Sequence, residues 1–438
     1  MENNKTFIGG EPIWGNACVG NNGYPSYLEY ARGYSESANL LIDTVLEKRL
    51  TVDVFIYPIC FNMRHSVELR LKGLITDLEK FKEYREKLPD FDLEGSHDLG
   101  KIWRYIKDEI VKLDKRYKRF IQELDSYIMD IAMVDSTGQV FRYPMSTENN
   151  RHLVEVNTIS LYILQRRFKE LEILLDYLSD FNELLLEEYS CKTYTQKLSR
   201  LDILNLAKSL PLKEEWKYRL DKKKLKDNLL ISGRELSRAL DFIQNHYEFS
   251  QFIGIDKELK YTNIDDLVLF FDIWIQIHID EITNKKPIMQ SINFSNKDDM
   301  ISIFEKIQRN EQILHSNLDG VLNSINIHSF IEIRALFYFG RDNKFRTPYS
   351  EEYISALEYK IKEEQHSYQD DFKHILHKPN AFDNILASLY FLGQYKIADS
   401  IRERYIHIFS LNIESVISGG LFRRESLLGY TDYYRYKS

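Results

Sequence analysis

The sequence predicts an all-α protein with an N-terminal helical bundle, interrupted by one small extended excursion, and a C-terminal helical domain. Apolar residues recur at three- and four-residue spacing through most of the chain, as in amphipathic helices. The 438 residues include only 18 Gly and 9 Pro, below the average usage of roughly 7% and 5%. This scarcity favours long uninterrupted helices. No fixed repeat period occurs, which argues against a solenoid.

Composition narrows the class of protein. With 43% hydrophobic and 29% charged residues, the chain is typical of a globular protein. Its net charge of −8 means that any contact with RNA would need a local basic patch. Its 3 cysteines are widely spaced, which argues against a disulfide framework or a zinc module. We find no signal peptide and no long apolar run, so we expect a soluble, cytoplasmic protein outside the membrane.

The first half of the chain is predicted to begin with an irregular arm, residues 1–25, which contain GG, GN and NNG. Residues 26–190 then form the bundle. Apolar spacing predicts four principal helices, the number in a compact bundle. Their expected ranges are 27–49, 54–77, 97–131 and 152–189.

Two connecting segments separate these helices. The loop before the third helix is rich in turn residues, and Ser96 is predicted to be the N-cap. Residues 135–150 break the helical pattern. Within them QVFRYP is short and β-like, so an extended excursion or small hairpin is expected.

Residues 191–232 are predicted to be a charged connector, because residues 213–228 carry many charges and few groups to bury. Helical spacing resumes in the C-terminal domain, residues 233–438. We expect helices at residues 233–249, 265–282, 298–314 and 349–378, and two within 382–409 that are separated at Gly393.

The second predicted helix carries four ionisable residues on one side. At about 100° per residue, Arg64, His65, Glu68 and Lys72 lie within one sector of about 100°. Apolar residues continue the adjoining sector, so this polar stripe should point inward. The opposite sector, predicted to face solvent, contains Ser66, Arg70, Gly73 and Asp77.

Two interpretations of the stripe remain. Arg64–Glu68 and Glu68–Lys72 are i,i+4 pairs, each of which stabilises a helix by about 0.2–0.5 kcal/mol, so the stripe would be a buried polar network. Alternatively, Arg64 or Lys72 binds a phosphate while His65 exchanges protons. Burying these charged side chains costs desolvation free energy, which the same ion pairs on the outer face would avoid. This cost favours the functional interpretation.

Three further residues are candidates for the same site. His97 lies at the first turn of its predicted helix, where the helix dipole favours the neutral base. Arg142 and Tyr143 lie in FRYP and would reach across from the excursion to bind substrate. Each also has a structural interpretation, His97 as a solvent-exposed residue near a helix cap and Arg142–Tyr143 as a packed pair at a turn.

The remaining motifs in the sequence give weaker indications of function. No P-loop, GxGxxG, GxSxG, HExxH or EF-hand pattern occurs. The residues between 366 and 377 include three histidines and Asp370 at helical spacing, as on a metal-binding face, but apolar residues lie opposite. That stripe should therefore face solvent, and no metal or other cofactor is predicted. Basic residues with tyrosines at 216–226 and 430–438 would either touch phosphates or be solvated surface.

Four segments in order resemble a known family. YARGYSESANLLI, DVFIYPICFNMRHSVELRLKGLI, GSHDLGKIW and DSTGQVFRYP resemble a group of uncharacterised bacterial helical proteins associated with the HEPN-like superfamily, which occurs in toxin–antitoxin and antiphage-defence systems. The resemblance covers about residues 27–190. Its most specific element is RHxxELxLK, which begins at Arg64.

The resemblance implies a function. Known HEPN ribonucleases bring an Arg, a polar residue and a later His to a dimer interface, and they cut RNA without metal through the ribose 2′-hydroxyl. Arg64 and His65 match the start of that motif, Glu68 stands where the later His is expected, and His97 would replace it as general base. The implied protein is a metal-independent, RNA-acting homodimer of defence or toxin type. The alternative is a non-catalytic module that binds a partner protein in such a system.

Overall fold

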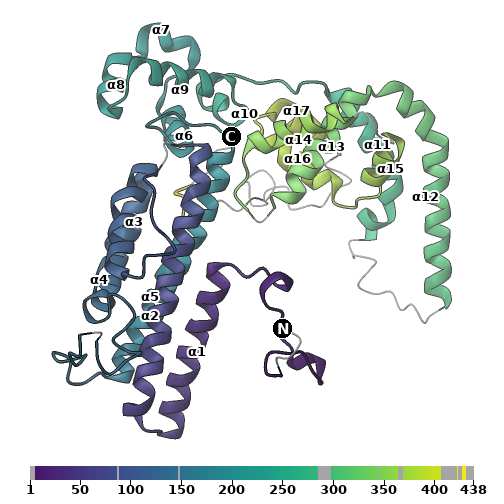
Figure 1. The fold of residues 1–438 in the computed structure, drawn as a ribbon. Coiled ribbons are helices and arrows are strands. Elements are labelled where there is room, and N and C mark those ends of the chain that lie inside the picture. The colour runs from purple at the N-terminus through teal and green to yellow at the C-terminus, as the bar shows by residue number, and fades with distance from the viewer. Residues whose placement is uncertain are drawn as a thin grey trace. The chain divides into compact units, whose positions relative to one another are not determined.

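The computed structural model describes residues 5–85, 88–146, 148–284, 297–344, 346–363, 368–405, 422 and 427–430. These residues form helices joined by turns, without a β-strand, and their single isolated bridge pairs Met145 with Arg151 (Figure 1). The all-α prediction is confirmed. The chain divides into two compact units, residues 1–190 and 191–438. In the described part of the chain, no helix is both long and apolar enough to cross a membrane.

The first unit is a bundle around α2, which contacts α1, α3 and α5. A capping box of Ser26 and Glu29 begins α1, and the left-handed residue Arg49 ends it. The short link that follows returns the chain alongside α1 (Figure 1). The helices are α1 (Tyr27–Lys48), α2 (Val52–Leu78), α3 (Leu99–Leu113), α4 (Lys118–Val134) and α5 (Leu161–Ser190).

Helix α2 is enclosed on more sides than its sequence predicted. The polar stripe points inward as expected, with Arg64, Glu68 and Lys72 buried. The predicted solvent face was wrong, because Ser66 is only 1% exposed. A Cβ at Gly73 would lie 3.2 Å from the Tyr27 Cβ, so α1 packs closely on that face. Small residues therefore mark a helix contact here.

The helix predicted at residues 97–131 is divided in two. Asp114 adopts an extended conformation (φ −152°, ψ 130°), and its carboxylate accepts a hydrogen bond from the Arg116 backbone N–H at 2.9 Å. This local cap competes with continuous helix, so the chain turns and α4 packs on α3. The α3 N-cap is Asp98 rather than Ser96, since the Asp98 carboxylate accepts from the Lys101 N–H at 2.9 Å.

The excursion between α4 and α5 is longer than predicted. Residues 152–160 are extended or bent rather than helical, and α5 begins at Leu161. The Ser160 carbonyl accepts the Leu164 N–H at 2.9 Å, the first bond of that helix. Residues 135–160 therefore form one irregular segment against the bundle, which becomes a wall of the two pockets described below.

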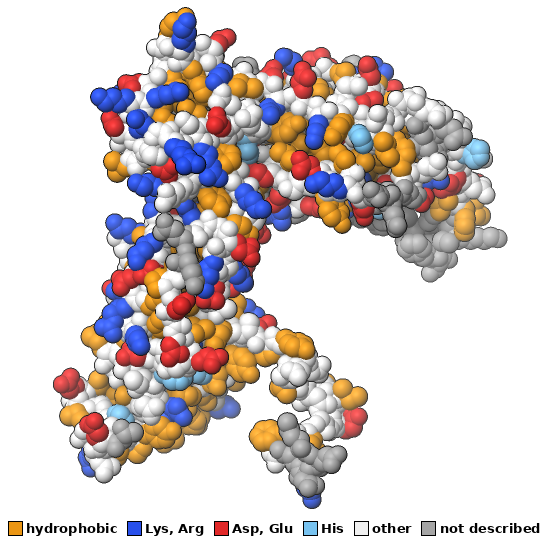
Figure 2. Space-filling model, turned by 45° about the horizontal axis from the view of Figure 1, so that its top comes forward, with side chains coloured by type: hydrophobic (Ala, Val, Ile, Leu, Met, Phe, Trp, Pro, Cys, Tyr) orange, Lys and Arg blue, Asp and Glu red, His pale blue; other side chains and the backbone are white. Residues whose placement is uncertain are grey.

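The N-terminal arm is irregular, as predicted, and every residue from 5 to 26 is exposed. Two 3₁₀ turns shape it, Ile13–Gly15 and Gly20–Asn22. The Asn16 side chain exchanges two hydrogen bonds of 2.9 Å with the Gly10 backbone. Despite this defined backbone, the arm exposes large apolar side chains (Figure 2), namely Phe7, Ile8, Ile13, Trp14, Val19 and Tyr24.

The second unit begins directly at residue 191, so the predicted connector is part of a folded unit. Within it, α6 (Arg200–Ser209) packs on α9 (Gly233–Asn245) and α10 (Tyr247–Ser250). The fully buried Arg200 forms ion pairs with Glu248 and with Glu351. The predicted connector therefore missed α6, whose apolar spacing lies just before the charged run at residues 213–228. That run forms α7 (Trp216–Arg219) and α8 (Lys222–Leu229).

The core of the second unit includes a helix that the sequence analysis missed, α13 (Ile327–Asp342). It packs on α16 (Ala381–Phe391), and Gly340 permits this, because a Cβ there would lie 2.2 Å from the Asn384 carbonyl oxygen. Gly393 has a φ of +71° and separates α16 from α17, as predicted. The remaining helices are α11 (Ile264–Asn284), α12 (Lys297–Ser324), α14 (Ser350–Lys362), α15 (Tyr368–Leu376) and α17 (Tyr395–Tyr405).

Candidate functional site

The carboxylate of Glu68 is the centre of the predicted site. Its Oε1 lies 3.0 Å from Lys72 Nζ and 2.9 Å from His97 Nδ1. Its Oε2 pairs with Arg64 Nη1 and lies 3.7 Å from His65 Nδ1. Helical spacing accounts for Arg64, His65 and Lys72, while His97 comes from the loop before α3. These five residues, all predicted, are the Glu68 cluster.

The cluster keeps the buried Glu68 ionised. Burial by itself would raise the pKa of this carboxyl group. The contacts of His65 and His97, with the charges of Arg64 and Lys72, outweigh burial and hold the pKa well below its ordinary value of 4.5. At neutral pH the carboxylate therefore carries its charge and can only accept hydrogen bonds.

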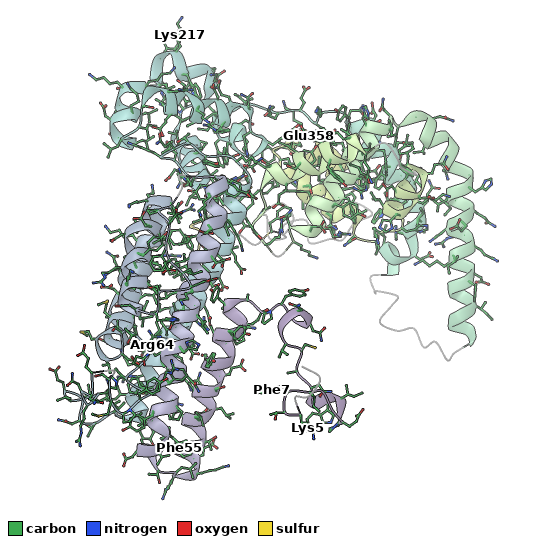
Figure 3. The ribbon with its side chains drawn as sticks, viewed as in Figure 1. Lys5, Phe7, Phe55, Arg64, Lys217 and Glu358 are labelled. Atoms are coloured by element: carbon green, nitrogen blue, oxygen red, sulfur yellow. The ribbon has the colours of Figure 1, made fainter. Side chains whose placement is uncertain are left out.

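Arg64 connects three segments of the bundle. It is 2% exposed and lies within the first unit (Figure 3). Its Nε donates to the Asp135 carbonyl at 3.2 Å, and its Nη2 donates to the carbonyls of His97 at 2.5 Å and Ser136 at 2.7 Å. These bonds and the Glu68 pair engage the guanidinium inside the protein. Arg64 and Lys72 were predicted to bind phosphate, and in the structure both are buried against Glu68.

The turn after α4 is shaped to receive Arg64. The Asp135 carboxylate closes it by accepting the N–H groups of Gln139 at 2.9 Å and Val140 at 3.2 Å. Gly138 has a φ of +77°, and a Cβ there would lie 3.2 Å from Arg64 Nη1. The sequence predicted an extended excursion here but not the contact of its turn with Arg64, although an Asp-Ser-Thr-Gly turn is a signal for left-handed backbone.

We expect Gly138→Ala to lower the free energy of unfolding by about 1–3 kcal/mol, because alanine resists this backbone conformation and crowds Arg64. Urea denaturation measures the change. Gly33→Ala is the control, since Gly33 lies in α1 with no atom near its Cβ position. There alanine should stabilise by about 0.5–1 kcal/mol. Equal effects of the two substitutions would contradict the role of the Gly138 turn.

The two histidines of the cluster reach the surface. The His65 side chain is 27% exposed and the His97 side chain 64% exposed. His97 precedes the Asp98 N-cap, so it lies just outside the helix rather than in its first turn. Because the ionised Glu68 only accepts, His97 Nδ1 carries the proton and donates to Glu68 Oε1. In the neutral ring, Nε2 then has the free electron pair.

Aromatic rings hold the His65 imidazole in place. It stacks on Phe61 with centroids 5.6 Å apart, and the Tyr34 ring meets it edge-on at 4.5 Å. Neither ring was predicted as part of the site. Phe61 stands one helical turn before His65, so the i,i+4 spacing used for the charged pairs would have identified it.

Arg142 and Tyr143 lie at the surface near these rings, as predicted. The Arg142 Cζ lies 5.6 Å from the Phe61 centroid, and its Nη2 donates to the Tyr143 hydroxyl at 3.2 Å. Both residues line an open depression of about 850 Å³ between the start of α2 and residues 140–159. The charged residues in its wall are Arg142 and Asp53.

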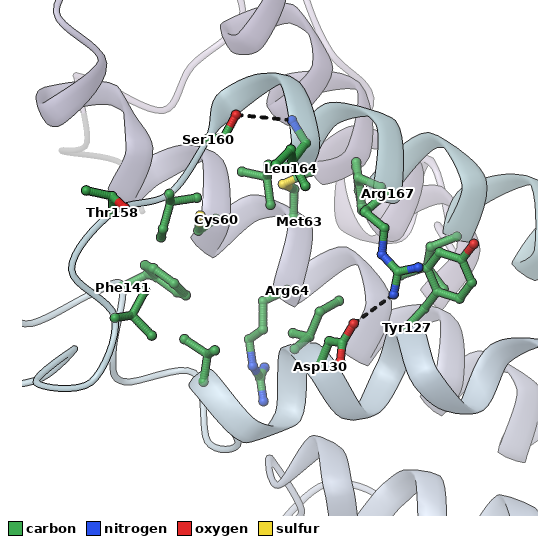
Figure 4. A pocket seen from close by; sticks show the side chains of 17 residues that line it. Cys60, Met63, Arg64, Tyr127, Asp130, Phe141, Thr158, Ser160, Leu164 and Arg167 are labelled. Carbon is green, nitrogen blue, oxygen red and sulfur yellow. Dashed lines mark hydrogen bonds and ion pairs between the residues drawn. The ribbon is translucent and has the colours of Figure 1, made fainter.

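A second cavity, of about 420 Å³, borders Arg64 and shares Phe141, Val156, Thr158 and Ile159 with the wall of the depression (Figure 4). Its walls come from α2, α4, the start of α5 and residues 141–160. We call it the Cys60 cavity, after the buried thiol in its wall. The sequence analysis missed it, because residues 152–160 were expected to continue a helix.

No metal site emerges from the described residues, where no group of three or more His, Cys, Asp or Glu side chains could hold an ion. Of the predicted solvent-facing histidine stripe, His366 lies outside the described residues. The two histidines of the stripe that the structure describes, His374 and His377, are exposed, so this part of the stripe faces solvent. The apolar residues of α15 beneath them are buried, namely Phe372, Ile375 and Leu376.

The low pKa of Glu68 predicts an acid-dependent loss of stability. A carboxyl group whose pKa is lower in the folded than in the unfolded protein stabilises the fold above its ordinary pKa. Its contribution should therefore fall as the pH drops below the ordinary value of 4.5. Denaturation curves of wild type and Glu68→Gln between neutral and acidic pH measure this. The wild type should lose more stability in acid than the variant; parallel curves would contradict the pairing.

No protein family, curated protein or solved structure matches this chain. The functional argument therefore rests on the geometry of the Glu68 cluster and on the residues around it.

Proposed function

We propose that the first unit is a metal-independent endoribonuclease of antiphage-defence or toxin type. The observation that carries this proposal is the placement of two accessible imidazoles against one ionised carboxylate, with His97 Nδ1 at 2.9 Å and His65 Nδ1 at 3.7 Å from Glu68 oxygens. Two such imidazoles supply the base and the acid that phosphodiester cleavage needs. Glu68 orients them, and Arg64 holds the loop that carries His97.

In the proposed reaction His97 Nε2 takes the proton of a ribose 2′-hydroxyl. The 2′-oxygen forms a bond to the adjacent phosphorus as the bond from phosphorus to the 5′-oxygen breaks. Protonated His65 gives its proton to that leaving oxygen. The products are a 2′,3′-cyclic phosphate and a 5′-hydroxyl, so no metal or other co-reactant is required.

The surroundings of the histidines suit an anionic, base-bearing substrate. The exposed Arg142 is the cation best placed to meet a phosphate, since Arg64 and Lys72 are buried in the Glu68 cluster. The exposed Tyr143 ring offers a surface on which a base can stack. Arg142 and Tyr143 therefore act as substrate-binding residues.

The test is incubation of the purified full-length protein with a pool of single-stranded and structured RNAs in EDTA. We expect cleavage fragments that end in 2′,3′-cyclic phosphate, identified by mass spectrometry. DNA of the same sequence is the control, since it lacks the 2′-hydroxyl and should stay intact. RNA that remains whole under all conditions, or cleavage of DNA as well, would overturn the proposal.

A second candidate function is a non-catalytic module that binds a partner protein or a second copy of the chain. The four hydrogen bonds that Arg64 donates inside the bundle favour it, since they fit a structural network. So does the arm, in which Trp14 is 88% exposed and Ile13 71% exposed. If RNA stays intact and light scattering finds a dimer that Trp14→Ser dissociates, this function replaces the enzyme.

A further inference from the structure

The Cys60 cavity is large and mostly apolar. Its volume of about 420 Å³ lies within the range of small-molecule sites, roughly 300–1,000 Å³. Apolar side chains form most of the wall, including Met63, Phe141, Leu164 and Phe168. The hydroxyl groups of Thr158 and Ser160, both exposed residues, lie at its margin (Figure 4). A cavity of this kind suits an apolar body with one polar end.

Each charged side chain in the wall is already neutralised by a partner. Arg167 Nη2 forms an ion pair with Asp130 Oδ2 at 2.7 Å, and its guanidinium lies 3.8 Å from the Tyr127 ring centroid. Arg64 is paired with Glu68. Burial, with the nearby charge of Asp135, raises the pKa of the Cys60 thiol to about 12, so this group stays uncharged. A charged ligand would therefore lose its hydration without gaining a partner.

We propose that the Cys60 cavity binds an uncharged, largely apolar small molecule, and that its occupancy is sensed by the Glu68 cluster through Arg64. Arg64 is the shared element, since this residue lines the cavity while its guanidinium binds Glu68 and the His97 carbonyl. Phe141 provides a second connection, because it lines the cavity and directly precedes Arg142. The regulatory part rests on the proposed function, whereas the binding part does not.

Binding is tested with N-phenyl-1-naphthylamine, an uncharged probe whose fluorescence rises in apolar surroundings. We expect saturable binding of one probe per chain. Anilinonaphthalene sulfonate has the same ring system plus a negative charge, and it should bind about tenfold more weakly or worse, because the cavity offers its charge no partner. Equal or stronger binding of the sulfonate would overturn the assigned ligand class.

The site of binding is tested by filling the cavity. Leu164→Trp adds bulk to the wall and should abolish probe binding. Tyr162→Trp is the matched control, because Tyr162 lies on the same turn of α5 but is 71% exposed and outside the cavity wall. Decanol and decanoate provide a test without mutation, since decanol should displace the probe at a concentration about tenfold lower. Binding that survives Leu164→Trp, or displacement by decanoate at the decanol concentration, would refute the site.

Coupling to the cluster is measured by NMR of the histidine ring signals. Saturation with N-phenyl-1-naphthylamine should shift the His97 and His65 signals in wild type and leave them unchanged in Leu164→Trp. Unchanged signals at full occupancy would refute the coupling. Since both readouts are independent of RNA cleavage, an inactive protein that binds the probe would overturn the ribonuclease proposal alone.

Discussion

Replacing His97 by alanine is expected to lower the rate of RNA cleavage by about 10²–10⁴-fold, the usual contribution of a general base. The variant should stay folded, because the His97 side chain is 64% exposed and few groups depend on it for burial. Its carbonyl, which binds Arg64 Nη2, remains in the alanine variant. Initial rates on one RNA substrate, together with a urea denaturation curve, separate loss of chemistry from loss of fold.

The control for His97→Ala is His374→Ala, which removes an exposed histidine from α15 in the other unit and should leave the rate unchanged. Full activity of His97→Ala, or an equal loss in His374→Ala, would remove His97 from the mechanism. His65→Ala then tests the proposed acid in the same assay.

Replacing Arg64 by alanine is expected to lower the free energy of unfolding by about 3–5 kcal/mol, the cost of leaving a buried charge without its partner. The substitution takes one of two cations from the buried Glu68 carboxylate, which keeps Lys72 at 3.0 Å, and removes the donors to the carbonyls of His97, Asp135 and Ser136. Urea denaturation monitored by circular dichroism measures the change. RNA cleavage should be lost as well, because the loop that carries His97 loses its attachment.

Arg70→Ala is the matched control on the same helix. The Arg70 side chain is 10% exposed, but its partner Asp176 is 59% exposed, so the substitution leaves no buried charge unpaired and should cost less than Arg64→Ala. The double variant Arg64→Ala/Glu68→Ala should cost less than the two single substitutions together, because each single substitution already removes the Arg64–Glu68 ion pair. If Arg64→Ala costs no more than Arg70→Ala, Arg64 does not organise the bundle.

The residues of the Glu68 cluster could be identified from the sequence because helical geometry is local. Arg64, Glu68 and Lys72 meet because i,i+4 residues share one face. Helical geometry could not predict the contact between His97 and Glu68, because these residues are 29 positions apart and meet only when the loop before α3 folds back onto α2. The position of His97 at a predicted helix start made that residue a candidate, and the three-dimensional structure supplied the hydrogen bond.

The errors have a common cause, which is competition between local pattern and packing. Ser66 and Gly73 looked solvent-facing because small polar residues often are, yet α1 covers them. Apolar spacing ran across Asp114, so one helix was expected where a local cap divides two. In the second unit, α6 was not predicted because it lies next to a charged run. Its buried Arg200 nevertheless forms ion pairs with residues of two other helices.

The sequence by itself determined the helical class, the inward direction of the polar stripe, the glycine stop at Gly393 and the residues that surround Glu68. Each of these depends on spacing along one segment or on the backbone preference of one residue. Only the tertiary structure decided which histidine nitrogen meets Glu68, that Arg64 is engaged by three carbonyls, and that a cavity lies behind it. Those features arise where α2, α4, α5 and the loops meet, and contacts between distant segments depend on how all of them pack together.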